Sequence, residues 1–380
     1  MRKVFTAAAV PAVAAAGIVL ASLPASAAPS SDGAPTVTVV ASGLNSPKQL
    51  TIGPGGVYVA ESGTGGSTCV TAGGTSECEG KTGAVALVTP FGTRNVITGL
   101  SSVLEGNEGA AGPTAIAFGR GKTALLFQDT AVNPDGTTAV QGPGADAFGK
   151  LLLARRSWRS LSWSVGANLA AFAAANPQDP ATLGGLPGSE TSYDSDPYDV
   201  VPYRDGFAIA DAGANDVLWL SSKGQLSILA RLPFIPMVFD GITVDAQAVP
   251  TSLAVGPDGA LYVGELVGFP DQPGSSSIYR IVPGRAPSVV ASGLTAVTAI
   301  AFDREGRLLA AEYSTAGFLA PSVPGALVRV DISTGTVTTL PVSGLSQPTG
   351  LAVSRQGDVF VSVNGNSAGT GEVLLITGLD

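Results

Sequence analysis

The chain has 380 residues, of which 50 are Gly and 27 are Pro, and 45% of it is hydrophobic while only 13% is charged. This composition excludes a disordered chain, and the lack of a three-residue Gly period excludes collagen. The net charge of −9 disfavours nucleic acid or an anionic membrane as a partner, and the absence of histidine excludes an imidazole base or a His-ligated metal. The turn-rich, Val-rich balance indicates an all-β protein.

The first 27 residues have the pattern of a secretory signal peptide. A basic start (residues 1–3) precedes an apolar run (4–23), and Ala25-Ser26-Ala27 supplies an A-x-A cleavage signal. An uncleaved membrane anchor is the alternative, which Pro11 and the small-residue site disfavour. We therefore expect a secreted, extracellular protein that starts at Ala28 and has no membrane association after cleavage.

The two cysteines, Cys69 and Cys78, lie close together in a stretch rich in Gly, Ser and Thr. In an exported protein, such a pair predicts a local disulfide that orders one loop. A metal site would need more soft ligands, and none are near in the sequence.

A unit of strand, tight turn and strand recurs six times along the chain. Its copies are residues 47–61, 113–129, 197–211, 250–265, 297–312 and 348–364. The alternating apolar positions and turns such as PDG, REG and RQG are typical of β-hairpins. A third strand follows every copy, and a fourth follows the first five. The units then span about 46–98, 113–165, 196–230, 249–291, 296–340 and 347–376.

The last unit lacks a fourth strand, whereas the N-terminus has a spare one at residues 36–44. Its VVASGL (39–44) is identical to the VVASGL at 289–294, which ends the fourth unit. We therefore predict one domain, residues 28–380, that is a six-bladed β-propeller with four antiparallel strands per blade. Strand 36–44 completes the last blade and closes the ring, which a β-sandwich or a β-solenoid would not explain.

The long insertions fall on the connections that a propeller places on one face. They are residues 62–82, 130–148, 166–196, 232–249, 266–276 and 313–324. Insertions on one face of a repeat protein often mark its binding face. Within one of them, NLAAFAAAN (168–176) begins at an Asn cap and ends before Pro177, which predicts a short helix.

Polar residues end most of the second strands and form a predicted acidic rim at the channel mouth. They are Glu61, Asp129, Asp211, Glu265, Glu312 and Asn364, although Gln128 and Val363 are the strict equivalents in units two and six. The first strands start beside them, at Lys48, Thr114, Tyr198, Thr251, Thr298 and Thr349. Crowded carboxylates need a compensating cation, and oxygen ligands without His or Cys suit Ca²⁺ or Mg²⁺.

A structural role for these acids is the alternative. Lys48 would pair with one carboxylate, and the others would accept backbone N–H groups of neighbouring loops. Glu105 and Glu108 could join the rim from above, while Asp194, Asp196 and Asp199 are expected to cap turns. The candidate ligand-binding residues are Lys48, Glu61, Glu108, Tyr198, Asp211, Glu265 and Glu312.

The chain resembles the ScyD/ScyE family of exported six-bladed propellers. The resemblance rests on VVASGLNSPKQLTIGPGGVYVAESGTGG (39–66), EGNEGAAGPTAIAF (105–118), the Ala-rich helix with Asn176-Pro177, and DSDPYDVV (194–201). It covers nearly all of the mature chain, and its wider theme is shared by TolB-like, NHL, SMP-30/gluconolactonase and quinoprotein propellers. This family has no established activity, so the resemblance implies fold and export rather than chemistry.

Two enzyme groups with this architecture offer comparisons. Quinoprotein sugar dehydrogenases resemble the chain at SGLNSP (42–47) but use a histidine base, which this chain lacks. SMP-30/gluconolactonase propellers hold a divalent metal, but their early Glu-Gly-Pro motif has only loose stand-ins here, at Glu61 and Glu105-Gly106. No NAD, haem or quinone cofactor is expected.

Three functions remain open from the sequence. The favoured one is a non-catalytic, monomeric protein that binds a small molecule, a glycan or a protein on a loop-rich acidic face, with or without Ca²⁺. The second is a metal-dependent lactonase or related hydrolase that uses a rim carboxylate and a metal-bound water. The third is a structural accessory of a secreted pathway.

Overall fold

The computed structural model describes residues 34–72, 75–105, 109–119, 121–128, 147–156, 161–177 and 195–379. The expected signal peptide lies outside these residues, as do Glu108, Asp129 and Asp194. Within the described parts of the chain, no helix has the length and apolar character that a membrane span requires.

The described residues form the predicted propeller of six antiparallel sheets, in which the strands of blades two to five follow one another in chain order. Blade one contains β2 (Pro47–Gly53), β3 (Gly56–Glu61), β4 (Thr68–Ala72), β5 (Thr75–Thr89), β6 (Gly92–Glu105) and β7 (Ala110–Ala111). Blade two contains β8 (Pro113–Gly119), β9 (Lys122–Phe127), β10 (Lys150–Arg156) and β11 (Leu161–Asn168). Blade three contains β12 (Pro197–Tyr203), β13 (Gly206–Asp211), β14 (Asp216–Leu220) and β15 (Leu226–Arg231).

The second half of the ring repeats this four-stranded pattern. Blade four contains β18 (Pro250–Val255), β19 (Leu261–Glu265), β20 (Ser276–Ile281) and β21 (Ser288–Leu294). Blade five contains β22 (Val297–Phe302), β23 (Leu308–Glu312), β24 (Ala326–Val330) and β25 (Val337–Thr339). Blade six contains β26 (Gly350–Val353), β27 (Val359–Val363), β28 (Gly371–Thr377) and the N-terminal strand β1 (Thr36–Leu44).

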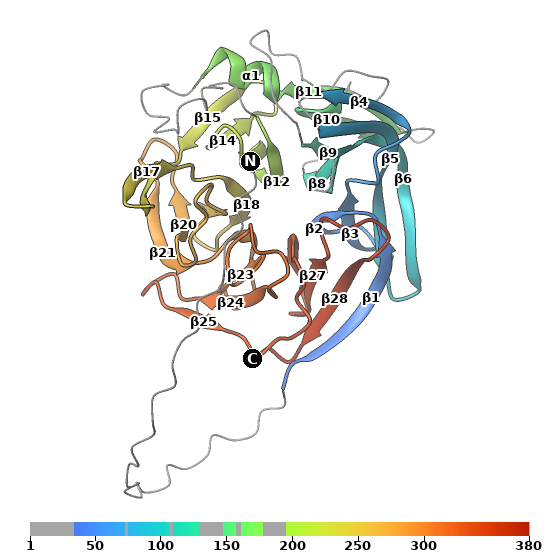
Figure 1. Ribbon diagram of the computed structural model, residues 1–380. Coiled ribbons are helices and arrows are strands. Elements are labelled where there is room, and N and C mark those ends of the chain that lie inside the picture. Colours follow the sequence, from blue (N-terminus) through green and yellow to red (C-terminus); the bar gives the residue numbers. More distant parts are fainter. Residues whose placement is uncertain are drawn as a thin grey trace, which may run out of the picture. The chain divides into compact units, whose positions relative to one another are not determined.

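The inner strands of the blades contact one another in ring order. The order is β2, β8, β12, β18, β22, β26 and again β2, so the ring closes. Figure 1 shows the sheets around a common centre, with β2, β8, β12 and β18 on the inner side. Between each pair of neighbouring blades lies a buried apolar cluster. The core is therefore six interfaces between sheets rather than one central mass.

Strand β1 pairs with β28, which confirms the predicted closure by the N-terminal strand. Its pairing skips one residue after Val39 and another after Ser42. Strand β21 of blade four carries the same VVASGL sequence and skips the equivalent positions, with Gly43 and Gly293 both at positive φ. Identical residues therefore bend two outer strands in the same way.

Three features extend the basic ring. Strands β5 and β6 are the longest of the blade, and β6 continues to Glu105, beyond the predicted end of the first unit at residue 98. The Cys69–Cys78 disulfide joins the neighbouring pair β4 and β5. The predicted helix is present as α1 (Leu169–Ala175), with Asn168 Oδ1 accepting the N–H of Ala171 at 3.0 Å. The 232–249 insertion contains an additional hairpin, β16 (Ile235–Phe239) and β17 (Ile242–Ala246), which the sequence analysis did not predict.

Candidate functional site

The start of the inner strand is irregular in each of the first five blades. Immediately after the strand's first residue, the pairing register with the second strand shifts. The residues at this shift are Lys48-Gln49, Thr114, Tyr198, Thr251 and Thr298. A bulge re-aims a side chain, so this irregularity turns two polar residues in blade one, and one in each of blades two to five, out of the regular pleat.

These side chains join the blades around the channel. Threonine hydroxyls donate to the first carbonyl of the next inner strand, from Thr114 to Pro197 (3.1 Å), Thr251 to Val297 (2.6 Å), Thr298 to Pro348 (2.7 Å) and Thr349 to Pro47 (2.7 Å). Ser62 Oγ donates to the Pro113 carbonyl at 3.1 Å between blades one and two. Asp199 Oδ2 accepts the N–H of Leu253 at 2.8 Å between blades three and four. Every blade junction is thus crossed by a hydrogen bond, and the predicted threonines are structural.

Three of the predicted rim acids hold the turns that begin their own blades. Glu61 Oε2 accepts the N–H of Asn45 at 2.8 Å, and Glu312 Oε1 accepts that of Thr295 at 2.8 Å. Asp211 accepts the N–H of Asp196 and the hydroxyl of Ser195, both at 2.7 Å. Burial raises the pKa of Glu61 and of Glu312, while the backbone donor in each case lowers it.

Glu265 occupies the same position in blade four but lacks this contact. The turn before β18 is held instead by Asn215, whose Oδ1 accepts the N–H of Val249 at 2.9 Å. Glu265 is 0% exposed, and neither of its carboxylate oxygens has a hydrogen bond of good geometry. Burial raises its pKa to about 8, although Ser277 and the hydroxyl of Tyr279 lie near enough to lower it. Glu265 is therefore a buried carboxyl that is protonated at neutral pH.

The register corrects one part of the predicted rim. Pro113 pairs with Phe127, just as Pro47 pairs with Glu61, so Phe127 and not Gln128 is the equivalent of the acids in blade two. Gln128 lies one residue further on and donates to Asp196 Oδ2 at 3.5 Å. In blade six, Asn364 donates its side-chain amide to the carbonyl of Thr370 in its own loop, at 2.9 Å.

A shared cation site is not formed by the acids that the structure describes. Among the described residues, no three Asp, Glu, Cys or His side chains come together as metal ligands. Asp211, Glu61 and Glu312 each direct an oxygen at a backbone N–H group, which is the structural role given as the alternative. Asp129 and Glu108 lie outside the described residues, so a Ca²⁺ site that includes them stays a prediction.

Gln49 spans the channel beneath the mouth. Its amide nitrogen donates to the carbonyls of Thr251 (3.1 Å) and Thr298 (2.9 Å), which belong to blades four and five. The side chain starts in blade one, is buried, and therefore links three blades across the centre of the ring. The repeat pattern in the sequence does not single out Gln49, because no other blade has a long side chain at this position.

Lys48 starts a chain of hydrogen bonds at the mouth. Its Nζ donates to Asn366 Oδ1 at 2.8 Å, and Asn366 Nδ2 donates to the hydroxyl of Tyr313 at 3.1 Å. These residues come from blades one, six and five, and the Tyr313 ring lies 4.7 Å from that of Phe318. Burial raises the pKa of Tyr313 to about 12, so its hydroxyl stays protonated. We call Lys48, Asn366 and Tyr313 the mouth cluster.

Tyr198 lies close to this cluster from blade three. Burial raises the pKa of its hydroxyl, and the charges of Asp196, Tyr313 and Asp199 raise it further. Of the predicted ligand-binding residues, Lys48 and Tyr198 therefore approach the same part of the mouth. Asn366 and Tyr313 lie in the insertions that follow second strands. The repeat does not extend into these insertions, so the sequence does not separate a ligand-binding residue from an ordinary loop residue there.

Asp199 was expected to cap a turn, but it lies within β12. Its Oδ1 accepts the N–H of Val200 at 2.7 Å, while Oδ2 makes the junction with Leu253. Burial raises its pKa to about 7, and the two backbone donors lower it. The residue therefore joins two blades and does not face the mouth as a rim acid.

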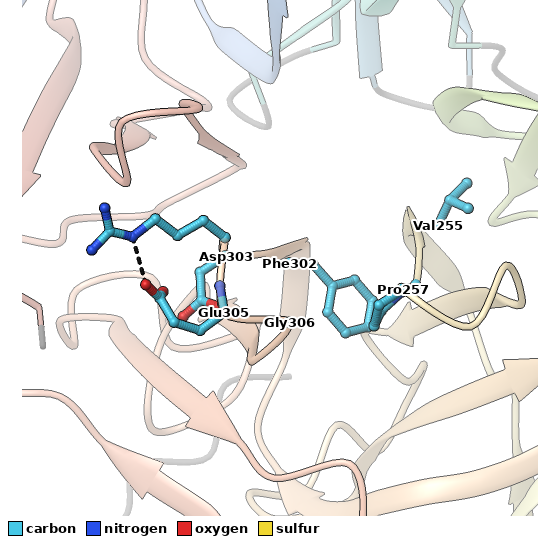
Figure 2. A pocket seen from close by; sticks show the side chains of 8 residues that line it. Val255, Pro257, Phe302, Asp303, Glu305 and Gly306 are labelled. Carbon is cyan, nitrogen blue, oxygen red and sulfur yellow. Dashed lines mark hydrogen bonds and ion pairs between the residues drawn. The ribbon is translucent and has the colours of Figure 1, made fainter.

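A hollow of about 400 Å³ lies on the opposite face, between hairpin turns of blades four and five. Figure 2 shows the ring of Phe302 beside Pro257 on one side and Asp303 with Glu305 on the other. Its charged groups pair with one another, because Arg304 bonds Glu305 at 2.5 Å and Arg307 bonds Asp303 at 2.6 Å. Such exposed pairs within turns are typical of a solvated surface.

No protein-family model matches the chain, and no curated protein sequence matches it. Solved structures do resemble it. One is a provisionally assigned oxidoreductase (glucose dehydrogenase) from Thermus thermophilus, with a TM-score of 0.54 and 16% identity over 90% of this chain and 100% of that chain. Another is the PQQ-bound aldose sugar dehydrogenase from Streptomyces coelicolor, with a TM-score of 0.51 and 14% identity over 90% and 98%.

A provisionally assigned gluconolactonase is also similar, with a TM-score of 0.50 and 12% identity over 90% of this chain and 91% of that chain. At such identities the likeness shows architecture and not chemistry. The chain is thus a six-bladed β-propeller with the fold of sugar dehydrogenases and gluconolactonases.

Proposed function

We propose that this protein is an exported, non-catalytic binding protein that holds a small polyhydroxylated molecule, such as a glycan unit, at the mouth of the channel. The observation that carries the proposal is the mouth cluster, in which Lys48, Asn366 and Tyr313 from three blades share one chain of hydrogen bonds. The resemblance to the exported ScyD/ScyE propellers supports the fold and the compartment of this proposal.

The chemistry of the mouth cluster suits hydroxyl groups. The Lys48 ammonium donates hydrogen bonds, whereas the Asn366 amide and the Tyr313 phenol can both donate and accept them. Ligand hydroxyl groups also donate and accept hydrogen bonds, so they match this set. The half-buried ring of Phe318, which packs on the buried Tyr313, adds an aromatic side chain beside these polar groups, as is common in ligand sites. Gln49 closes the channel beneath, which restricts a ligand to the mouth.

Catalysis has weaker support in the described residues. General acid–base chemistry needs a titratable group within reach of the substrate. Glu61, Asp211 and Glu312 are occupied by backbone donors, and Glu265 is sealed from solvent. The chain also has no histidine. The described carboxylates near the mouth are therefore better suited to stabilising the fold than to acid–base catalysis.

Thermal-shift screening of the mature protein against neutral sugars and sugar acids tests this function. We expect at least one sugar to raise the melting temperature, and Asn366→Ala to abolish that rise while the exposed control Asn95→Ala keeps it. A rise that survives Asn366→Ala would place the ligand elsewhere. Turnover of a lactone or ester panel with Ca²⁺ or Mg²⁺, lost in Glu61→Gln, would establish the hydrolase alternative instead.

The Ca²⁺ prediction has its own test. Heat on calorimetric titration with Ca²⁺, together with a raised melting temperature that Asp129→Asn removes, would support a cation site. Neither heat nor a shift would leave the rim acids with the structural role that their backbone contacts indicate.

A further inference from the structure

Exposed apolar side chains concentrate in one part of the described surface. The described residues include eleven large apolar side chains that are exposed, and five of them lie in the insertions 232–249, 266–276 and 313–324. These five are Val238, Phe239, Ile242, Phe269 and Leu319. Because successive strand residues face opposite sides, Val238 lies on the other face of its hairpin from Phe239 and Ile242, and we call the remaining four the apolar patch. The other six belong to separate strands and turns around the ring. Clustered exposed apolar side chains mark interaction sites, whereas scattered ones do not.

The hairpin of β16 and β17 presents much of this patch. Asp240 and Gly241 form its two-residue turn with φ angles of 48° and 78°, the pattern of a tight primed turn. Near its base, Met237 and Ala246 pack on Val267 in a small buried cluster. Towards its tip, Val238 and Ile242 are 62% and 66% exposed. The hairpin is therefore anchored at one end and presents apolar side chains at the other.

The three insertions are fixed to one another. The Phe239 ring meets the Phe269 ring edge-on at 4.7 Å, although both remain exposed. Gln272 donates its side-chain amide to the carbonyl of Val238 at 2.8 Å. Asp271 Oδ2 accepts the N–H of Leu319 at 2.8 Å. These bonds hold the patch in place before any partner binds, which lowers the ordering penalty of binding.

The charge around the patch has one sign. The three insertions contain Asp240, Asp245 and Asp271 and no Lys or Arg. Asp240 and Asp245 are exposed on the same hairpin as Val238 and Ile242. A second copy of this chain, or an anionic bilayer, would bring like charges together at this surface. A partner with basic residues beside apolar ones would complement both features.

We propose that the apolar patch is a docking surface for a cationic amphipathic segment of another protein. Apolar side chains of the segment cover Phe239, Ile242 and Phe269, and its Lys or Arg residues face Asp240 and Asp245. The edge-on aromatic pair is the expected centre of the contact, because aromatic anchors dominate interface energetics. The patch and the mouth cluster share no residue, although the 313–324 insertion contributes Leu319 to the patch and Tyr313 to the mouth cluster, and the proposal does not rest on sugar binding.

A short labelled peptide of alternating leucine and lysine is the probe. We expect the mature protein to bind it in fluorescence anisotropy, with an affinity that falls as salt is added. Phe239→Ser should weaken binding by about tenfold, while Phe91→Ser, which removes a fully exposed Phe from the turn between β5 and β6, should leave it unchanged. Replacing both Asp240 and Asp245 by Asn should weaken binding and remove most of its salt dependence.

Control peptides and a second variant make the test decisive. Peptides that alternate serine with lysine, or leucine with glutamate, should not bind, and Ile242→Ser should repeat the effect of Phe239→Ser at an unchanged melting temperature. The proposal is overturned if the leucine–lysine peptide does not bind, or binds both variants as well as the wild type. Self-association that Phe239→Ser removes would assign the patch to a second copy, and binding to phosphatidylcholine vesicles would assign it to a membrane; either result overturns the proposal.

Discussion

The buried carboxyl of Glu265 makes the stability of this propeller dependent on pH, and Glu265→Gln should remove that dependence. Glu265 is fully buried at the end of β19, and its nearby donors, Ser277 and the Tyr279 hydroxyl, only partly offset the effect of burial. Burial therefore favours the neutral form of the carboxyl, and ionisation would place a charge where these neutral donors, and no cation among the described residues, face it. Glutamine keeps the size and the polarity of the neutral acid but has no proton to lose.

The size and sign of the effect follow from the pKa. Burial raises it from 4.5 to about 8, so the folded protein holds this proton more tightly than the unfolded chain does. At 1.36 kcal/mol per pH unit, the difference corresponds to about 5 kcal/mol. Stability from this group is complete below pH 4.5, falls as the pH rises, and is lost above about pH 8. The figure is an upper bound, because water entering beside the ionised group would relax the structure.

Urea unfolding followed by circular dichroism between pH 4 and 9 measures this difference. We expect the two proteins to have similar stability near pH 4, and the Gln variant to be more stable by several kcal/mol near pH 9. Other buried carboxyls such as Asp199 are present in both proteins, so their contributions cancel. Glu305→Gln, which changes an exposed carboxylate in a surface turn, should follow the wild type. Parallel pH profiles for wild type and Glu265→Gln would refute the reasoning.

Deletion of residues 36–44 should abolish cooperative thermal unfolding, because it removes β1 and exposes the edge of β28; an unchanged melting temperature would contradict the closure. Gln49→Ala should lower the unfolding free energy by about 2–3 kcal/mol, because two hydrogen bonds across the channel are lost, whereas the exposed control Gln225→Ala should have no effect in the same melts. Asn168→Ala should destabilise the protein by about 1 kcal/mol through loss of the α1 cap, and a larger loss would mean that the side chain does more than cap the helix.

Most of the fold could be predicted because its information is repeated. A hairpin unit present six times indicates its own boundaries, and the spare strand at 36–44 fits the open edge of β28. The identical VVASGL segments behave identically even in their bulges, since Gly43 and Gly293 permit the same positive φ. Local sequence and ring topology therefore agree at this strand.

The insertions were harder to predict because each occurs once. The hairpin of β16 and β17 lies in a stretch that includes two prolines and exposed apolar residues, so alternation alone did not separate it from a loop. The one-residue error at Gln128 has a similar cause. Alignment of the repeats by sequence made Gln128 the equivalent of Glu61, whereas backbone pairing puts Phe127 opposite Pro113.

The rim acids show why a residue's position can be predicted when its role cannot. Propeller topology placed Glu61, Asp211 and Glu312 at equivalent strand ends, and the structure agrees. Their direction depends on the turn before each inner strand, where Ser46 and Ala296 adopt left-handed backbone conformations with φ of 50° and 45°. Such turns present an N–H to the acid, and a carboxylate that accepts it is no longer directed at the channel.

The position of Gln49 across the channel could have been predicted from side-chain size. The third residue from the start of the inner strand is Gln49 in blade one, and the equivalents are small or turned aside: Ala115, Asp199, Ser252, Ala299 and, counted from Pro348, Gly350. A Cβ on Gly350 would lie 2.9 Å from the Cα of Gln49 and 2.5 Å from the carbonyl oxygen of Lys48, so the smallest residue faces the largest. One long amide among short neighbours can cross the axis, whereas six long side chains could not fit around it. The asymmetry of this one repeat position therefore places one side chain across the channel, and the mouth above Gln49 is where we propose that a ligand binds.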